Sequence, residues 1–192
     1  MEAIKPNEPT FTIADIEALP EGERAELIDG EMYMMAPPAT IHQRISMDLS
    51  VEISNHIRRK GGKCQVYAAP FAVYPKKDDK NYVEPDISVI CDSGKLDNKG
   101  CHGMPDWVVE IVSPSSQHMD YLKKLVLYKE SGGHEYWVID PQTEMVAVYD
   151  FKEDTAYHYT FDQEITGHII PDLKIRINDY VLPLKTLSAS EL

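Results

Sequence analysis

The sequence lacks any long hydrophobic run. Crossing a bilayer as a helix takes about 18 consecutive apolar residues, and no segment of the 192 residues approaches that length. The N-terminal stretch MEAIKPNEPT also lacks the basic and apolar regions of a signal peptide. We therefore expect a cytoplasmic protein without a membrane segment. The apolar content of 43% is sufficient for a hydrophobic core, and the length favours a single domain over residues 1–192.

Cysteine is scarce as well. The three cysteines, Cys64, Cys91 and Cys101, are an odd number, and no two of them have the C-x-x-C spacing that is typical of zinc sites. We therefore expect structural thiols in a reducing compartment.

Basic residues are few: 19 Lys and Arg stand against 32 Asp and Glu, which gives a formal net charge of −13. This charge argues against a broad nucleic-acid-binding surface, because phosphate contacts depend on clustered Lys and Arg. It does not exclude DNA as a partner, since a divalent ion screens the acidic residues around it and short basic runs can act locally. Such runs occur at 58–60, 76–80 and 123–124.

Motifs of several common enzyme classes are also absent. The chain contains neither G-x-x-x-x-G-K-[ST] nor G-x-G-x-x-G, which excludes the usual nucleotide-binding sites. It contains no G-x-S-x-G elbow, so serine hydrolase chemistry is not expected.

Apolar periodicity and turn signals divide the chain into short elements. Asp29-Gly30 lies between two apolar-rich runs and predicts a hairpin over about 25–35, because both residues tolerate positive φ. A capping box of Thr40 and Gln43, followed by isoleucine and leucine at intervals of four, predicts a long helix. Other expected elements are a short helix within 10–20, a stop to the long helix at 61–62, a strand at 63–74 that runs past Pro70, a surface loop at 92–104 and a helix at 117–130.

Nearly unbroken apolar runs at 86–91 and 107–112 predict central strands that are buried on both faces. Two more runs, 135–140 and 145–150, flank a turn and predict antiparallel strands, and further short strands are expected in the tail. The fold class is therefore α/β (α+β), a mixed β-sheet flanked by helices, with an N-terminal hairpin and C-terminal antiparallel strands. A doubly wound parallel fold is not expected, because the regular βαβα alternation is missing.

Two acids, Asp86 and Glu110, lie in or beside these central strands. An unpaired charge there would be costly, so a bound cation or a hydrogen-bond partner is expected. Mg²⁺ is held by one or two carboxylates plus waters, and a bound metal polarises phosphate and lowers the pKa of water. Asp86 and Glu110 therefore predict a Mg²⁺ or Mn²⁺ site. The alternative is that each acid caps a turn or pairs with a lysine.

Five other residues are candidates for the same site. Asp120 and Lys124 are four apart and share one helix face, from which Lys124 is a candidate to reach the scissile phosphate or its attacking water; the alternative is a surface ion pair. His42, in the first turn of its helix, is a candidate ligand or proton carrier, or else a structural histidine. Glu26 and Glu31, on the two arms of the hairpin, are candidate outer ligands, although exposed acids are common on hairpins.

These residues carry a resemblance to a known family. The chain resembles the Uma-two family of restriction-endonuclease-like proteins in the string ELIDGE, His42, Pro85-Asp86, VVEIVSPSS with Glu110, then Asp120, Lys124, Tyr128 and EYWVIDP. The resemblance runs from about Ala25 to Tyr149. It implies the PD-(D/E)XK nuclease fold, in which a mixed sheet is flanked by helices and a divalent metal is bound at the split between central strands.

The resemblance also implies roles for individual residues. Asp86 would be the PD acid and Glu110 the (D/E) acid. The superfamily pattern has lysine two residues later, where this chain has Val112. In similar families the lysine is thought to have moved to the adjoining helix, and Lys124 fills that place with Asp120 beside it. The long, flexible lysine stem allows this, since it can present the ammonium at the same point from either element.

Three functional hypotheses remain open. The first is a Mg²⁺- or Mn²⁺-dependent endonuclease that hydrolyses DNA phosphodiester bonds, with Asp86 and Glu110 on the metal, Lys124 at the water, and His42 and Asp120 in support. The second is a non-catalytic scaffold or partner-binding protein with the nuclease fold, which the net charge of −13 favours. The third is a metal-dependent phosphodiesterase that acts on a small substrate. By analogy with dimeric nucleases, whose paired sites cut two strands, a homodimer is expected.

Overall fold

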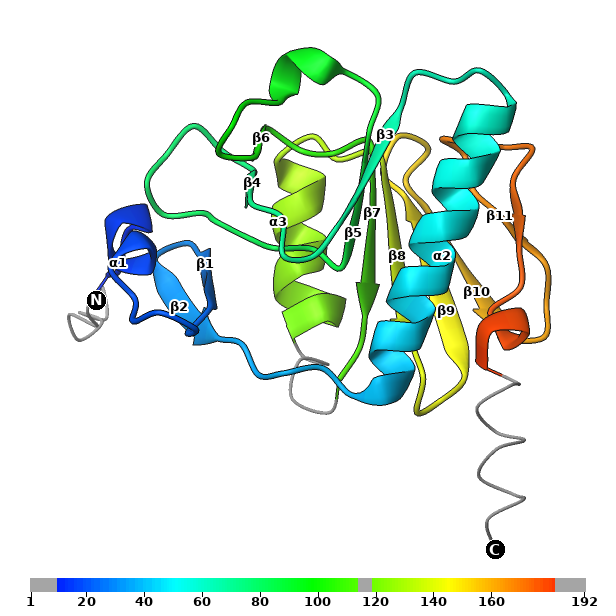
Figure 1. Ribbon diagram of the computed structural model, residues 1–192, viewed down its shortest axis with the longest axis horizontal. Helices are drawn as coiled ribbons and strands as arrows, with labels where there is room; N and C mark the ends of the chain where they lie inside the picture. Colours follow the sequence, from blue (N-terminus) through cyan, green and yellow to red (C-terminus); the bar gives the residue numbers. More distant parts are fainter. Residues whose placement is uncertain (1–9, 114–118, 182–192) are drawn as a thin grey trace, which may run out of the picture.

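The centre of the molecule is a six-stranded mixed sheet with helices on both faces (Figure 1). The computed structural model describes residues 10–113 and 119–181. The strand order is β10-β9-β8-β7-β5-β3, and only β7 and β8 are parallel. The strands are β3 (Gln65–Ala68), β5 (Ile87–Ile90), β7 (Trp107–Ile111), β8 (Glu135–Asp140), β9 (Met145–Asp150) and β10 (Thr155–Thr160). The predicted fold class and the two central strands are therefore confirmed.

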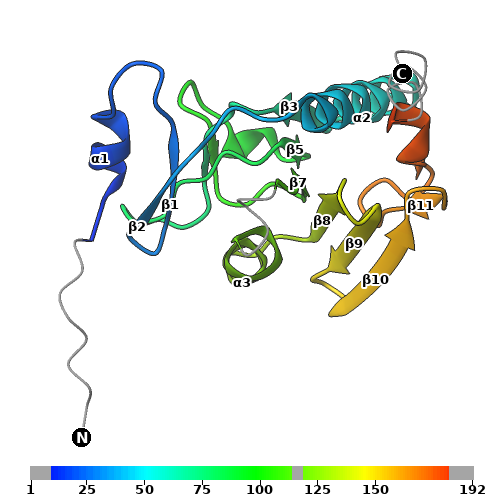
Figure 2. The same ribbon diagram turned by 90° about the horizontal axis from the view of Figure 1, so that it is seen from below.

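The two faces of the sheet carry different side chains because side chains alternate along a strand. On β7, Trp107, Val109 and Ile111 face helix α2 (Thr40–Arg59), whose buried residues recur at intervals of four. Val108 faces the opposite side, which helix α3 (Lys124–Glu130) covers. Figure 2 shows α2 and α3 on opposite sides of the strands. Burial on both faces explains the unbroken apolar run of β7.

A parallel pair of strands needs a crossover connection, and here the chain from β7 to β8 includes α3. The first turn of the predicted helix at 117–130 lies partly outside the described residues. From Met119 the chain forms a π-helical segment, Met119–Lys123, which continues directly into α3. Such π-helical insertions are frequent at functional sites because they re-aim the side chains of a helix.

The N-terminal elements follow the sequence closely. Helix α1 (Ile13–Glu17) begins after Thr12, whose backbone N–H donates to the Asp15 carboxylate at 2.7 Å. Strands β1 (Ala25–Ile28) and β2 (Glu31–Met34) form the predicted hairpin. Its two turn residues have positive φ, 50° at Asp29 and 83° at Gly30, as a tight hairpin turn of this kind requires.

Three local predictions are wrong. Thr40 is the first residue of α2, and the residue before it, Ala39, provides no side-chain cap, so the capping box of Thr40 and Gln43 does not form. The strand expected at 63–74 is interrupted at the cis bond between Ala69 and Pro70, because proline has no N–H to donate to a strand ladder. The chain resumes as β4 (Val73–Tyr74), which pairs with β6 (Cys101–His102) inside the expected surface loop; that loop also contains a short 3-10 helix, Ser93–Lys95.

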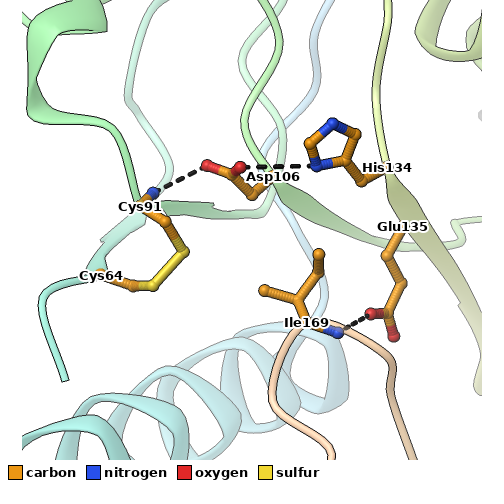
Figure 3. The surroundings of a disulfide bond; sticks show 6 residues. All are labelled: Cys64, Cys91, Asp106, His134, Glu135 and Ile169. Carbon is orange, nitrogen blue, oxygen red and sulfur yellow. Dashed lines mark hydrogen bonds and ion pairs between the residues drawn. A yellow bond between two sulfur atoms is a disulfide. The ribbon is translucent and has the colours of Figure 1, made fainter.

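The expectation of three free thiols is also wrong. Cys64 and Cys91 form a disulfide (Figure 3), and only Cys101 is free and buried. Gln65 of β3 pairs with Ile90 of β5, so the register places the two cysteines opposite each other, with Cα atoms 3.9 Å apart. A sequence separation of 27 gives no sign of such a pairing, because it depends on how the two strands align.

The C-terminal part of the described chain returns to the sheet. Strands β11 (Ile165–Thr166) and β12 (Lys174–Ile175) form a small antiparallel pair. Between them, the backbone N–H groups of His168 and Ile169 each donate to the buried carboxylate of Glu135 at 2.8 Å. Figure 3 shows the bond from Ile169. Among the described residues, no helix combines the length and the apolar character that a membrane span requires.

Candidate active site

Asp86 and Glu110 meet at one end of the two central strands. In the antiparallel pair β5–β7, Ile87 lies opposite Val109, and continuing this register by one residue places Asp86 opposite Glu110. Opposite residues of an antiparallel pair share a face of the sheet. The carboxylate of Asp86 accepts a hydrogen bond from the backbone N–H of Ile111 at 2.7 Å. The two acids therefore lie on neighbouring strands and on the same face of the sheet.

His42 approaches Asp86 from the first turn of α2. Its Nε2 atom lies 3.1 Å from Asp86 Oδ2, and 13% of the His42 side chain and 15% of the Asp86 side chain are exposed. Burial opposes the charged form of the imidazole, but the hydrogen bond and the charge of Asp86, together with the charge of Asp120, raise the pKa of His42 above its usual value. These two side chains form the accessible edge of the site.

Lys124 occupies the interior of the site. Its Nζ atom lies 2.8 Å from Glu26 Oε2, 3.0 Å from Glu110 Oε1 and 3.5 Å from Asp120 Oδ1. Only 5% of the Lys124 side chain is exposed. A lysine is almost never buried without charged partners, and here three carboxylates provide them.

Asp120 and Lys124 share a helix face, as their spacing of four predicts, but they are not a surface pair. As whole residues, Asp120 is 2% exposed and Lys124 is 4% exposed. Asp120 lies in the π-helical segment and Lys124 begins α3, and both side chains turn toward the sheet. The surface ion pair that the sequence left open is therefore wrong.

The two hairpin acids have different surroundings. Glu26, on the fully buried strand β1, contacts Lys124 through Oε2, and its Oε1 accepts the backbone N–H of Glu84 at 2.9 Å. Glu31 lies next to the turn on the more exposed strand β2, where its carboxylate contacts Lys123 and the Tyr33 hydroxyl. Glu26 thus belongs to a buried cluster with Glu110, Asp120 and Lys124, whereas Glu31 lies outside this cluster, against Lys123.

The cluster holds more negative than positive charge. Burial raises the pKa of Glu110 well above its usual range; the Lys124 ammonium opposes this shift, and the charges of Asp86, Asp120 and Glu26 add to it. Burial likewise opposes the charge on Lys124, yet Glu110, Glu26 and Asp120 together raise its pKa well above the usual value. One ammonium group does not balance the surrounding carboxylates, and a divalent cation would supply the missing positive charge.

The donor set fits a hard divalent ion in charge and in chemistry. Mg²⁺ and Mn²⁺ bind carboxylate oxygens, and Mg²⁺ needs only one or two of them because it keeps several waters. Asp86 and Glu110 provide such oxygens on adjacent strands. Within residues 10–113 and 119–181, however, no three His, Cys, Asp or Glu side chains are arranged as a ready-made metal-binding set. The fit therefore rests on the two strand acids and the excess negative charge.

Two tyrosines that the sequence did not mark as site residues also contact this cluster. The Tyr128 hydroxyl donates to Glu110 Oε1 at 2.7 Å, and the Tyr136 hydroxyl donates to the backbone carbonyl of Asp120 at 2.9 Å. The spacing offered a signal for Tyr128, because it follows Lys124 by four residues and so lies on the same helix face. Tyr136 lies in the string EYWVIDP that carries the family resemblance, but its contact depends on how the π-helical segment packs against β8.

Comparisons with known proteins identify the family and the fold. The family model of Uma2, described as "Putative restriction endonuclease", matches residues 13–178. An uncharacterized protein of Synechocystis sp. is 33% identical over 106 residues, which are 55% of this chain and 54% of that protein, so the chain spans about half the length of that relative. The crystal structure of a "putative nuclease belonging to DUF820" from Anabaena variabilis has a TM-score of 0.72 at 21% identity, and the match covers 88% of this chain and 97% of that chain. This likeness shows a shared fold, and the family match shows that the chain belongs to the Uma2 family of restriction-endonuclease-like proteins.

Proposed function

We propose that this protein is a Mg²⁺- or Mn²⁺-dependent endonuclease that hydrolyses DNA phosphodiester bonds. The observation that carries the proposal is the position of Lys124, whose ammonium lies 3.0 Å from Glu110 although the strand itself has Val112 where the nuclease pattern has lysine. The helix thus delivers the missing ammonium to the carboxylate of the central strand. Family membership supports the same reaction class.

Each residue has a role that follows from its contacts. Asp86 and Glu110 would hold the divalent ion, which when bound polarises the phosphate and lowers the pKa of water. Lys124 offers positive charge to the phosphate as negative charge develops on it. Glu26 and Asp120 hold the lysine side chain in place from two directions.

His42 would act at the accessible edge of the site. Its contact with Asp86 orients that carboxylate, and its raised pKa favours the protonated imidazole in the metal-free protein. A bound cation would favour the neutral form, which can then take up a proton. The substrate phosphate would approach from this side, because Lys124 and Glu110 are buried behind it.

Two observations favour the alternative of a non-catalytic scaffold or partner-binding protein. The net charge is −13, and the lysine is almost fully enclosed by carboxylates. A phosphodiesterase that acts on a small substrate would need no DNA groove, and the roles of Asp86, Glu110 and Lys124 would be the same. A homodimer with paired sites would allow both DNA strands to be cut.

Cleavage assays on plasmid and single-stranded DNA with Mg²⁺ or Mn²⁺ test the proposal. Asp86→Asn, Glu110→Gln and Lys124→Met should each lower the cleavage rate by about 10²-fold or more. Lys123→Met is the matched control, since Lys123 is the neighbouring lysine but contacts Glu31 outside the cluster; its rate should stay within about threefold of the wild type.

The proposal fails if the wild type binds no divalent ion, or if the three variants cleave as well as it does. DNA binding without cleavage, equal in all variants, would favour the scaffold. Cleavage of small phosphodiesters but not of DNA would favour the third alternative.

A further inference from the structure

Three side chains form a stripe along one face of the helix that follows β7. Asp120, Lys124 and Tyr128 are four residues apart, and all three are buried. Asp120 and Lys124 are already part of the site, whereas Tyr128 has no role in the proposed reaction. Its ring packs edge-on against Tyr136 at a centroid distance of 5.1 Å, so the hydroxyl points from a fixed ring.

The Tyr128 hydroxyl and the Lys124 ammonium converge on the same atom. Tyr128 donates to Glu110 Oε1 at 2.7 Å and Lys124 donates to it at 3.0 Å. A carboxylate oxygen has two lone pairs, so these two donors use the acceptor capacity of Oε1. With Oε1 held in this way, the plane of the carboxylate and the direction of its second oxygen, Oε2, are set.

Lys124 alone does not provide this restraint. Its ammonium is also 2.8 Å from Glu26 and 3.5 Å from Asp120, so its three N–H donors are shared among three carboxylates and only one of them is directed at Glu110. A neutral phenol on a packed ring has no such alternatives. Hydrogen bonds to a metal-binding carboxylate orient it toward the metal, and loss of such a partner typically costs about 10–100-fold in metal affinity or activity.

We propose that Tyr128 is a positioning residue that fixes the Glu110 carboxylate in the orientation that binds the divalent ion. The inference rests on the proposed function, in which Glu110 is a metal ligand. The opposing interpretation is that the hydroxyl merely satisfies a buried polar group, as buried tyrosines usually do. That interpretation predicts an effect on stability and none on metal affinity.

The affinity of the metal-stripped protein for Mn²⁺ distinguishes the positioning role of Tyr128 from a purely structural one. Calorimetry and the electron paramagnetic resonance signal of the ion both measure this affinity. Tyr128→Phe keeps the ring and should raise the Mn²⁺ dissociation constant about tenfold. Tyr149→Phe is the matched control: Tyr149 stacks on Tyr136 at 5.9 Å, and its hydroxyl makes no hydrogen bond to any described residue. The Mn²⁺ dissociation constant of Tyr149→Phe should stay within about twofold of the wild-type value. Excess Mn²⁺ should restore most of the cleavage rate of Tyr128→Phe, because the defect is in affinity.

The outcomes distinguish this inference from the proposed function. If the wild type binds no Mn²⁺, both are overturned. If wild type and Tyr128→Phe bind Mn²⁺ equally, or if Tyr149→Phe weakens binding as much as Tyr128→Phe, the inference alone is overturned. If Tyr128→Phe does not fold, 3-fluorotyrosine at position 128 replaces it: this residue keeps the ring and strengthens the donor, and an unchanged dissociation constant would again overturn the inference.

Discussion

At the level of single residues, the charge around Lys124 determines how the site responds to substitution. One ammonium faces Glu26, Glu110 and Asp120 in a region that is almost closed to water. Removing one partner of a buried ion cluster leaves the others uncompensated, which is far more costly than losing a surface pair.

Lys124→Met should therefore lower the free energy of unfolding by about 3–5 kcal/mol near neutral pH. Glu110 already has a raised pKa from burial, and the variant loses the ammonium that opposes the shift. An acid whose pKa is raised on folding contributes stability below its unfolded pKa and loses it as the pH rises through the folded value. Because the wild type loses stability in the same way up to its own raised Glu110 pKa, the difference between the two proteins should be smaller at about pH 5 and larger at about pH 9.

Urea denaturation at both pH values measures this effect. Lys123→Met is the control, because Lys123 is partly exposed and its loss should cost about 1 kcal/mol or less at either pH. A loss for Lys124→Met that equals the control, or that does not grow with pH, would contradict the charge imbalance.

Sequence patterns distinguish some of the candidate site residues and not others. Sequence patterns predicted Asp86 and Glu110 on neighbouring buried strands and Asp120 and Lys124 on one helix face, whereas the meeting of Lys124 with Glu110 was implied only by the family resemblance. Glu26 and Glu31 were indistinguishable there, since both are hairpin acids. The structure separates them, because β1 is buried and brings Glu26 to Lys124, whereas Glu31 lies on the more exposed β2.

At the level of elements, the β1–β2 hairpin matters because it brings Glu26 to Lys124. Its turn is anchored on both sides: Phe11 N–H donates to the Gly30 carbonyl at 2.8 Å, and Gly30 N–H donates to the Lys80 carbonyl at 3.0 Å. Gly30 has a φ of +83°, and an added Cβ would overlap the Thr10 side chain.

Gly30→Ala should therefore destabilise the protein by about 2 kcal/mol, partly from the left-handed backbone and partly from the overlap. Gly22→Ala is the matched control: φ is +90° there too, but nothing lies within 4 Å of the added Cβ. It should cost only about 1 kcal/mol. Equal costs in chemical denaturation would show that the contact with Thr10 contributes nothing.

Other elements show why local patterns were insufficient. The strand expected at 63–74 has an apolar pattern throughout, but Pro70 interrupts its ladder, and the second half pairs with β6 in another sheet. The helix before β8 begins with a π-helical segment, although its sequence shows ordinary helical spacing. The pairing of Val73–Tyr74 with β6 depends on a segment that is distant in the sequence, so the local pattern does not predict it.

At the level of the whole molecule, the Cys64–Cys91 disulfide joins the edge strand β3 to β5. Two apolar clusters cover the two faces of the central sheet. The clusters share β5 and β7, so neither can unfold without exposing the other. We therefore propose one cooperative domain.

Reduction of the disulfide should lower the stability of that domain by about 3–4 kcal/mol, since the bond closes a loop with a sequence separation of 27. Near- and far-ultraviolet circular dichroism should report one coincident transition before and after reduction. Thiol titration should find one cysteine in unfolded, unreduced protein and three after reduction. In the native state Cys101 should react slowly, because burial raises the pKa of its thiol to about 11. Three reactive thiols without reductant would contradict the disulfide.

The sequence by itself determined the types of most elements, the hairpin turn, the two buried strands and the helix face that Asp120 and Lys124 share. These features follow from short-range patterns: side-chain alternation, helical spacing and the backbone freedom of an Asp-Gly pair. The tertiary structure decided which side chains meet: Glu26 rather than Glu31 at Lys124, Tyr128 at Glu110, and Cys64 opposite Cys91. Strand register and the faces on which elements pack depend on contacts between residues far apart in the chain, and no local pattern encodes them.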